Sequence, residues 1–410
     1  MNLKNRQAFV VIAFVFLVVG FLELTLSLLA LASTRVDWLL TPPSTPQTVP
    51  DARLGYRPNP DYPGHDRKGF RNPKVPAKAH IVALGDSQTY GTGVRAAAAW
   101  PRQLESLTGK TVYSMAYGGY GPADSLVLWD EALALSPTVV VEAFYAGNDL
   151  FDSFDCIYNR GQLPELKSPD PQLQASVRDA EQSEPIQQRV VRMFQMGAAV
   201  DEETTTVTPD GVSLWRILSQ HSKIYGLLVR AWYEATRPAK QSSEPPQDEW
   251  TKATAFAELH PAYCQIFTSG QFKTVFTSEY RLAALDLGDP RIAEGLQISL
   301  RAIQKMHELA TRRGIRFLVV LIPTKEAVFR KLLQDSSVSY RALAENEERV
   351  WRITKDFLER NGIEYLDSLP VLREQLAAGI QPYRVSHDGH PNEPGHKAIA
   401  KLVAAHLESK

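Results

Sequence analysis

Four short segments of the chain carry residues that could together cleave an ester bond. They contain Ser87 in a glycine-bounded turn, Gly119 in a glycine-rich loop, Asn148 in Gly-Asn-Asp, and His390 in His-Asp-Gly-His-Pro-Asn. The Ser87 hydroxyl is a weak nucleophile that needs a base, and the His390 imidazole could be that base. The Gly119 N–H and the Asn148 amide could stabilise the negative charge that forms on an attacked carbonyl oxygen. Each segment alone is more typical of an ordinary turn, because Gly, Asp, Asn and Ser are common turn residues.

The first three segments each follow a stretch with the pattern of a buried strand. Apolar runs predict strands over residues 80–84, 111–115, 138–145, 315–322 and 363–366. Capping residues and helical periodicity predict helices over 100–108, 121–135 and 290–313, a helix that ends near Asn361, and a terminal helix over 393–407. Apolar strands that alternate with helices indicate a parallel sheet covered on both faces. Ligands of such sheets bind at the carboxyl ends of the strands, which is where the first three segments lie.

Taken together and in this order, the four segments resemble the four blocks of the SGNH (GDSL-type) esterase and acyltransferase superfamily. The resemblance covers residues 76–150 and 290–408 and implies an α/β fold, namely a flavodoxin-like three-layer α/β/α domain with a central parallel sheet. It implies that Ser87 is the nucleophile and His390 the base. The Ser87 and Gly119 N–H groups and the Asn148 side-chain amide resemble the family's oxyanion hole. The family chemistry needs no metal, and no cofactor is expected.

The last block departs from the usual Asp-x-x-His of the family. The residue three positions before His390 is His387, and the nearest carboxylate is Asp388, two positions before. Asp-x-His occurs in the related alginate-type O-acetyltransferases, which also resemble this chain in Ile-Pro-Thr-Lys at 322–325, so Asp388 is expected to orient the imidazole. The spacing of His387, His390 and His396 leaves a metal site as an alternative hypothesis, although no acidic or cysteine cluster accompanies them.

Residues 8–32 form an apolar run whose one formal charge is Glu23. A helix of this length is roughly 37 Å long and would cross a hydrocarbon core of ~30 Å. Because Lys4 and Arg6 precede the run, residues 1–7 are expected in the cytoplasm and the rest of the chain outside it.

A cleaved signal peptide is the alternative, since the small residues at 30–32 resemble a cleavage site. The apolar core of a signal peptide is typically only ~7–15 residues, which favours an uncleaved anchor. Glu23 is costly at that depth and predicts either a pairing partner or a carboxyl close to one membrane face.

The rest of the chain divides by composition. Residues 33–75 are expected to be a proline-rich spacer and lead-in, 76–150 the first half of the SGNH domain, and 289–410 its second half. Residues 151–288 are expected to be a large insertion, mainly helical or irregular.

Within that expected insertion, residues 159–188 have the polar, proline-containing composition of loops, and 213–236 the pattern of a helix. Both cysteines, Cys156 and Cys264, lie in it and could pair in an oxidising compartment. The sequence leaves the pairing open, because Cα atoms more than ~7 Å apart cannot be bridged.

The charge balance excludes some classes of protein. The 410 residues carry 45 basic and 46 acidic side chains, a net charge of -1 that gives no support for nucleic-acid binding. Two cysteines exclude a disulfide-dense scaffold and a cysteine-based zinc ribbon.

The sequence therefore predicts a membrane-anchored, single-pass, extracytoplasmic serine esterase, periplasmic in a Gram-negative cell, that acts on acylated cell-envelope carbohydrate or another small ester. One alternative is a polysaccharide O-acetyltransferase that uses the same Ser/His site, since hydrolysis and transfer share this machinery. Such a transferase would need a membrane partner to supply the acyl donor. The other alternative is a non-catalytic binding or scaffolding protein on the same fold.

Overall fold

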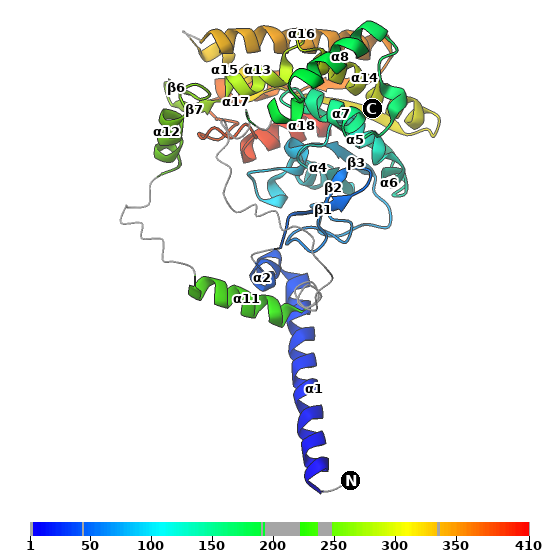
Figure 1. The fold of residues 1–410 in the computed structure, drawn as a ribbon, viewed down its shortest axis with the longest axis vertical. Coiled ribbons are helices and arrows are strands. Elements are labelled where there is room, and N and C mark those ends of the chain that lie inside the picture. Colours follow the sequence, from blue (N-terminus) through cyan, green and yellow to red (C-terminus); the bar gives the residue numbers. More distant parts are fainter. Residues whose placement is uncertain are drawn as a thin grey trace. The chain divides into compact units, whose positions relative to one another are not determined.

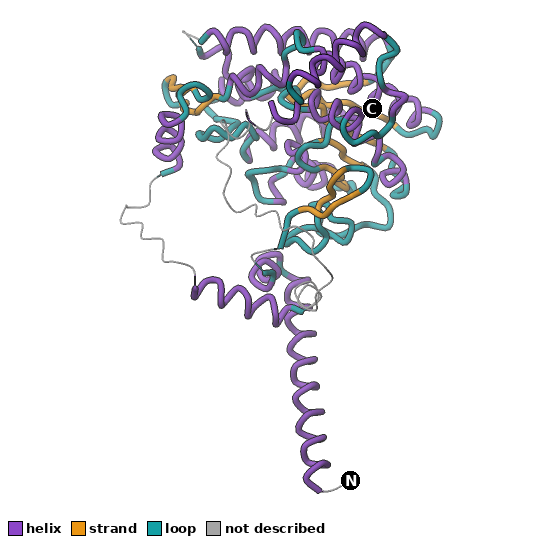
Figure 2. Tube along the Cα trace, in the orientation of Figure 1, coloured by secondary structure: helices purple, strands orange, loops and turns teal. Residues whose placement is uncertain are grey.

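The computed structural model describes residues 3–42, 45–189, 192, 222–236, 248–333 and 337–409. The chain folds as two compact units (Figures 1 and 2). The described residues of the smaller unit are 3–42, 45–49, 58–69 and 222–236. Those of the larger unit are 50–57, 70–189, 192, 248–333 and 337–409.

The larger unit is built on a five-stranded sheet whose strands are all parallel. The strands are β3 (Ile81–Gly85), β4 (Val112–Ala116), β5 (Val139–Tyr145), β8 (Arg316–Ile322) and β9 (Glu364–Asp367). Their spatial order is β4-β3-β5-β8-β9, which is the flavodoxin-like order. The direction in which strands are added reverses between β3 and β5, so the ligand-binding switch point lies at the carboxyl ends of these two strands. The predicted fold class is confirmed.

Successive residues of each strand point to opposite faces of the sheet, and both faces are buried. Val82 and Leu84 pack into one hydrophobic cluster, whereas Ile81 and Ala83 pack into another. The first cluster is completed by α7 (Asp149–Tyr158), α14 (Pro290–Thr311) and part of α16 (Val338–Arg360). The second is completed by α4 (Trp100–Thr108), α17 (Leu369–Ala377) and α18 (Glu393–Glu408). These helices form the outer layers of a three-layer domain (Figure 1).

Local signals set the helix ends as predicted. Asp289 caps α14 by accepting a hydrogen bond from the Arg291 N–H (2.9 Å), and Pro290 occupies the first turn. The predicted helix over 121–135 is instead two helices, α5 (Pro122–Val127) and α6 (Trp129–Leu133). The break is at the fully buried Leu128, whose backbone stays in the right-handed region (φ −82°) but whose ψ of −3° departs from the usual α-helical value of roughly −42°.

The described part of residues 151–288 lies in the larger unit, apart from α11 (Lys223–Thr236) and the preceding Ser222. Helix α7 begins at Asp149 and continues across the expected boundary at 151. Further elements of this segment are α8 (Pro171–Ser183), α12 (Glu249–Leu259), the antiparallel strands β6 (Gln265–Ser269) and β7 (Phe272–Phe276), and α13 (Ser278–Leu285).

Two expectations for this segment differ from the structure. Residues 159–188 contain helix α8, because Asp170 caps its first turn and Val177 is buried in the core despite the polar composition. Cys156 and Cys264 are both buried free thiols, so the possible disulfide is not formed. The predicted helix over 213–236 is described from Lys223 as α11, and residues 213–221 lie outside the described residues.

The other described α-helices and strands are five elements in the first hundred residues and α15, which follows β8. They are α1 (Leu3–Ala32), α2 (Thr34–Leu40), β1 (Thr48–Asp51), β2 (Gly55–Pro58), α3 (Ser87–Tyr90) and α15 (Lys325–Phe329). Among the described residues, α1 is the one helix long and apolar enough to cross a membrane. Apart from Ala30, no residue of its apolar part, Phe9–Ala30, is buried against the protein.

One carboxyl group lies inside the sheet itself. Glu142 of β5 is fully buried beside Leu84 and Val319 on the neighbouring strands. Burial, together with the nearby carboxylates of Asp86 and Asp124, raises its pKa from 4.5 to about 8. Glu142 is therefore mainly uncharged at neutral pH.

We expect Glu142→Gln to flatten the pH dependence of stability. Unfolded Glu142 titrates near 4.5 and folded Glu142 near 8, so between these pH values the folded state holds the extra proton and the unfolding free energy falls as pH rises. Urea unfolding at several pH values in this window measures the slope. The exposed Glu345→Gln is the control and should keep the wild-type slope. Equal slopes in the wild type and Glu142→Gln would contradict the prediction.

Candidate active site

The turn after β3 presents Ser87 at the carboxyl end of the strand. Gly85 has a φ of +139°, and a Cβ there would lie 2.9 Å from the carbonyl oxygen of Ala143 on β5, so only glycine fits. Asp86 then caps α3, because its Oδ1 accepts the Gln88 N–H at 2.8 Å. Ser87 is the first residue of that helix and is partly exposed between two buried neighbours.

Ser87, His390 and Asp388 form a continuous hydrogen-bonded chain. The Ser87 Oγ lies 2.8 Å from His390 Nε2, although the residues are 303 positions apart. His390 Nδ1 lies 2.5 Å from Asp388 Oδ1, which also accepts the His390 backbone N–H at 2.9 Å. This is the arrangement in which an imidazole can remove the serine proton while a carboxylate holds the other ring nitrogen.

The carboxylate of Asp388 stays ionised in this position. Burial alone would raise its pKa, but hydrogen bonds from the His390 ring and backbone, with the nearby charge of Lys325, hold it well below its usual value. An ionised Asp388 accepts a hydrogen bond from the Nδ1–H of His390, so Nε2 of the neutral ring is the acceptor that faces the Ser87 hydroxyl.

The three neighbouring histidines lie in different environments. His387 stacks on the ring of Phe256 at a centroid distance of 4.2 Å. His396 is fully buried in α18, and this burial lowers its pKa to about 3. Across the described residues, no group of His, Cys, Asp or Glu side chains is arranged to hold a metal ion.

Gly119 belongs to a peptide that lies beside Ser87. A Cβ at Gly118 would be 3.6 Å from the Ser87 Cβ, which places the Gly118–Gly119 peptide next to the serine. The Tyr56 hydroxyl donates to the Gly118 carbonyl at 2.8 Å. Because the N–H of a trans peptide points away from its C=O, this bond directs the Gly119 N–H away from Tyr56. Gly119 has a φ of +78°, and a side chain there would collide with the Tyr56 hydroxyl.

Asn148 lies at the carboxyl end of β5, at the start of α7. Its side-chain Nδ2 donates to Asp152 Oδ2 at 2.6 Å. An amide nitrogen carries two N–H groups, so one remains for another acceptor. The bond to Asp152 fixes the amide on α7, and no direct hydrogen bond joins it to Ser87.

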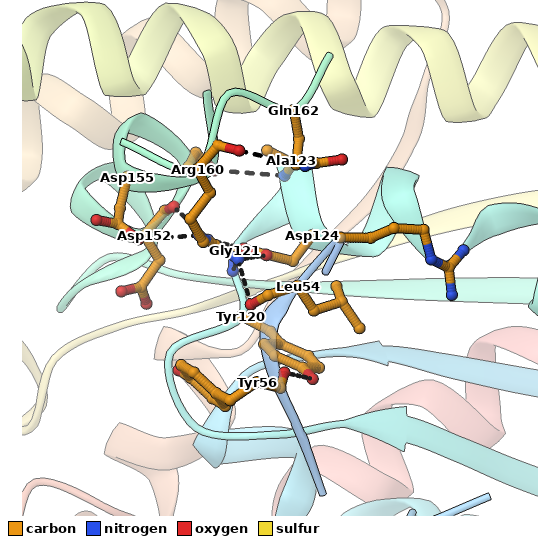
Figure 3. Close-up of polar contacts among 12 residues, drawn as sticks. Leu54, Tyr56, Tyr120, Gly121, Ala123, Asp124, Asp152, Asp155, Arg160 and Gln162 are labelled. Carbon is orange, nitrogen blue, oxygen red and sulfur yellow. Dashed lines mark hydrogen bonds and ion pairs between the residues drawn. The ribbon is translucent and has the colours of Figure 1, made fainter. Parts of the chain in front are cut away.

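An ion pair between Asp124 and Arg160 holds the glycine-rich loop at Gly121 (Figure 3). Buried Asp124 accepts the Gly121 N–H at 3.1 Å and pairs with Arg160 at 2.5 Å. Arg160 also donates to the Leu54 carbonyl (2.7 Å) and pairs with Asp155 (2.9 Å). Arg160 lies in the expected insertion and Leu54 in the expected spacer, so both segments support the candidate site.

Two buried cations outside the four blocks contact the loops of the site. The Arg281 side chain, on α13, donates to the Gly147 carbonyl (3.2 Å) and lies against Gly389, so it touches the residues just before Asn148 and His390. Sequence reasoning missed Arg281, because no motif surrounds it.

Lys325, unlike Arg281, donates a hydrogen bond to a residue of the proposed triad, Asp388. Its Nζ is fully buried and donates to the carbonyls of Val275 (2.7 Å), Ser386 (2.9 Å) and Asp388 (3.0 Å). Burial lowers its pKa to about 8, and the nearby carboxylates of Glu326 and Asp388 favour the charged form. Lys325 is the last residue of the Ile-Pro-Thr-Lys sequence, which was the one signal that pointed to it.

The fold and this constellation resemble those of an SGNH-type α/β domain. Residues 275–410 match the family model described as the SGNH hydrolase-like domain of the acetyltransferase AlgX. This match includes Asp388 and His390 and begins after Ser87, and it confirms the resemblance to the SGNH superfamily. The sequence has no significant match among curated proteins.

Two solved structures with some similarity to this chain are described as GDSL-type proteins. One is a protein from Desulfitobacterium hafniense assigned to the G-D-S-L family of lipolytic proteins, with 13% identity, 80% of this chain and 99% of that chain covered, and a TM-score of 0.34. Another is a GDSL-like lipase from Bacteroides thetaiotaomicron, with 11% identity, 80% and 87% coverage, and a TM-score of 0.32.

We expect Tyr56→Phe to lower kcat for an acyl ester with little change in KM. The variant keeps the ring but loses the bond that orients the Gly119 N–H, a donor that matters most in the transition state. The loss should stay below the roughly 10²–10³-fold caused by removing an oxyanion donor outright. Tyr365→Phe, which removes a hydroxyl bonded to exposed Glu359, is the control. A Tyr56→Phe enzyme with wild-type kcat would show that this orientation is unimportant.

Lys325→Met should lower kcat/KM by roughly 10²-fold, because a small displacement of the loop that carries Asp388 misaligns His390. The displaced Asp388 should also shift the acidic limb of the pH–rate profile, which a loss of stability alone would not do. Circular dichroism checks folding, and Lys397→Met, at an exposed position of α18, is the control. A folded variant with an unchanged profile would contradict the positioning role.

Proposed function

We propose that this protein is a serine acyl-ester hydrolase anchored in the membrane, with its active site outside the cytoplasm. The observation that carries this proposal is the hydrogen-bonded chain from Ser87 through His390 to Asp388 at the switch point of the sheet. An SGNH-type fold is the context in which these residue types perform ester chemistry, and the family match supports the same reading of the last block.

The reaction follows from the positions of these groups. His390 Nε2 takes the Ser87 proton as Oγ attacks the ester carbonyl. The oxyanion is held by the Ser87 and Gly119 N–H groups and by the remaining N–H of the Asn148 amide. When the tetrahedral intermediate collapses, His390 gives its proton to the departing alcohol and the acyl group stays on Ser87. Water, deprotonated by His390, then releases the acid and restores the hydroxyl.

A second candidate is acyl transfer to a carbohydrate hydroxyl, which replaces water in the last step. The match of residues 275–410 to the AlgX acetyltransferase domain favours it and favours an acetyl group. A transferase of this kind would take its acyl group from a donor supplied by a membrane partner, and its acceptor would be an envelope polysaccharide.

A retained anchor is supported by contacts within the smaller unit. Glu23 of α1 accepts hydrogen bonds from Ser222 Oγ (3.0 Å), from the Lys223 N–H and from the Ile224 N–H (3.2 Å). A cleaved leader peptide would leave these groups of α11 without this carboxylate. These bonds also supply the pairing partner that the depth of Glu23 predicts.

Ser87→Ala should abolish turnover of a small acetyl ester such as 4-nitrophenyl acetate, by at least roughly 10³-fold, since loss of a triad nucleophile costs more than this in proteases. Ser106→Ala, at an exposed position of α4, should keep wild-type activity. Released acetate, measured with and without an added polysaccharide acceptor, separates hydrolysis from transfer. Undiminished turnover by a folded Ser87→Ala enzyme would exclude the mechanism, and no turnover by the wild type would favour a binding protein.

A further inference from the structure

Helix α11 packs on α2 through one face that carries its described charged side chains. Lys223, Gly226 and Arg230 lie at helical spacing on this face. Lys223 Nζ pairs with Asp37 at 2.8 Å. Gly226 is buried against the Leu40 carbonyl so closely that no side chain would fit. This contact is therefore specific.

Arg230 completes the contact between the two helices. Its guanidinium donates to the Thr41 carbonyl at 2.8 Å and lies 4.0 Å above the Trp38 ring. The charge of Arg230 therefore faces α2 and Thr41, on the same side of α11 as Gly226.

The start of α11 is fixed at a defined depth along α1. Its first N–H groups donate to Glu23, about two helical turns before Ala30, which is roughly 10 Å along the helix axis. Helix α2 follows directly after α1. Helix α11 therefore contacts both helices, and it crosses beside the C-terminal end of α1 (Figure 1).

The outer face of α11 is apolar and exposed. Leu227 is 44% exposed, Leu228 63% and Trp232 66%. Positions 228 and 232 lie on the side of the helix opposite Gly226 and Arg230, which face α2. The exposed side chains of Leu228 and Trp232 therefore point away from α2, and Trp38 (52% exposed) adds a second aromatic ring at this end of the span.

We propose that α11 lies in the interface of the bilayer, with Leu228 and Trp232 inserted at the boundary between headgroups and acyl chains. A charged face, an opposite face of Leu and Trp, and a position beside a membrane span are the features of an interfacial amphipathic helix. The bilayer is the expected partner of this face, because the neighbouring apolar part of α1 is exposed and would itself contact lipid. The inference rests on the proposed anchor and adds a second lipid contact 200 residues further along the chain.

The test measures lipid contact of single introduced cysteines in the full-length chain. Leu228→Cys and Trp232→Cys probe α11, Val15→Cys probes α1, and Leu107→Cys, a leucine of α4 as exposed as Leu227, is the control. Each is labelled with an environment-sensitive fluorophore, and the wild type, whose two cysteines are buried, gives the background. The proteins are reconstituted in phosphatidylethanolamine and phosphatidylglycerol vesicles that contain a lipid with a nitroxide either near the carbonyl or near the chain end.

Labels at 228 and 232 should lose most of their emission with the shallow nitroxide and little with the deep one, and the label at 107 should lose none. A quenched label at 15 with unquenched labels at 228 and 232 would overturn the proposal while leaving the anchor intact. Blue-shifted labels on α11 that no lipid nitroxide quenches would mean that protein covers this face, which also overturns it. If the label at 15 is unquenched as well, the anchor and the proposal fail together. None of these outcomes depends on Ser87 turnover, so esterase activity is judged separately.

Discussion

The candidate site depends on one hydrogen bond, between Ser87 Oγ and His390 Nε2, which joins residues 303 positions apart. It can form because the sheet is parallel and its strands end at one edge, where Ser87 follows β3 directly. His390 reaches the same edge from the loop before α18. The imidazole is held there by Asp388, whose ionised state depends on the bonds that it accepts from His390. Nucleophile, base and carboxylate are thus a single unit.

That arrangement is surrounded by buried charge that must be compensated. Asp86, Asp124, Asp149 and Asp152 are buried near the strand ends, and Glu142 is buried within β5. Burial raises the pKa of each of them, which favours the uncharged form. Three cations, Arg160, Arg281 and Lys325, donate to carbonyls of the surrounding loops. Removing one partner of such a set leaves a buried charge or carbonyl unpaired, so we expect the loops and the buried charges to be coupled.

Polar groups of the smaller unit are likewise paired with one another. Glu23 would be unpaired within an apolar helix, and the N–H groups at the start of α11 need acceptors. Each satisfies the other. Lys223 and Arg230 likewise find partners on α2 and at Thr41, which leaves Leu228 and Trp232 on the outer surface.

The sequence by itself determined the five strands of the sheet and the candidate side chains, because those signals are local. The apolar run of β8, the Asp289-Pro290 start of α14 and the glycine turn before Ser87 each depend on a few adjacent residues. Only the tertiary structure decided that Tyr56, Arg160 and Arg281 support the site from segments expected to be spacer and insertion. Their contacts join residues that are far apart in the chain, and no local spacing encodes which distant loop a buried cation or hydroxyl will reach.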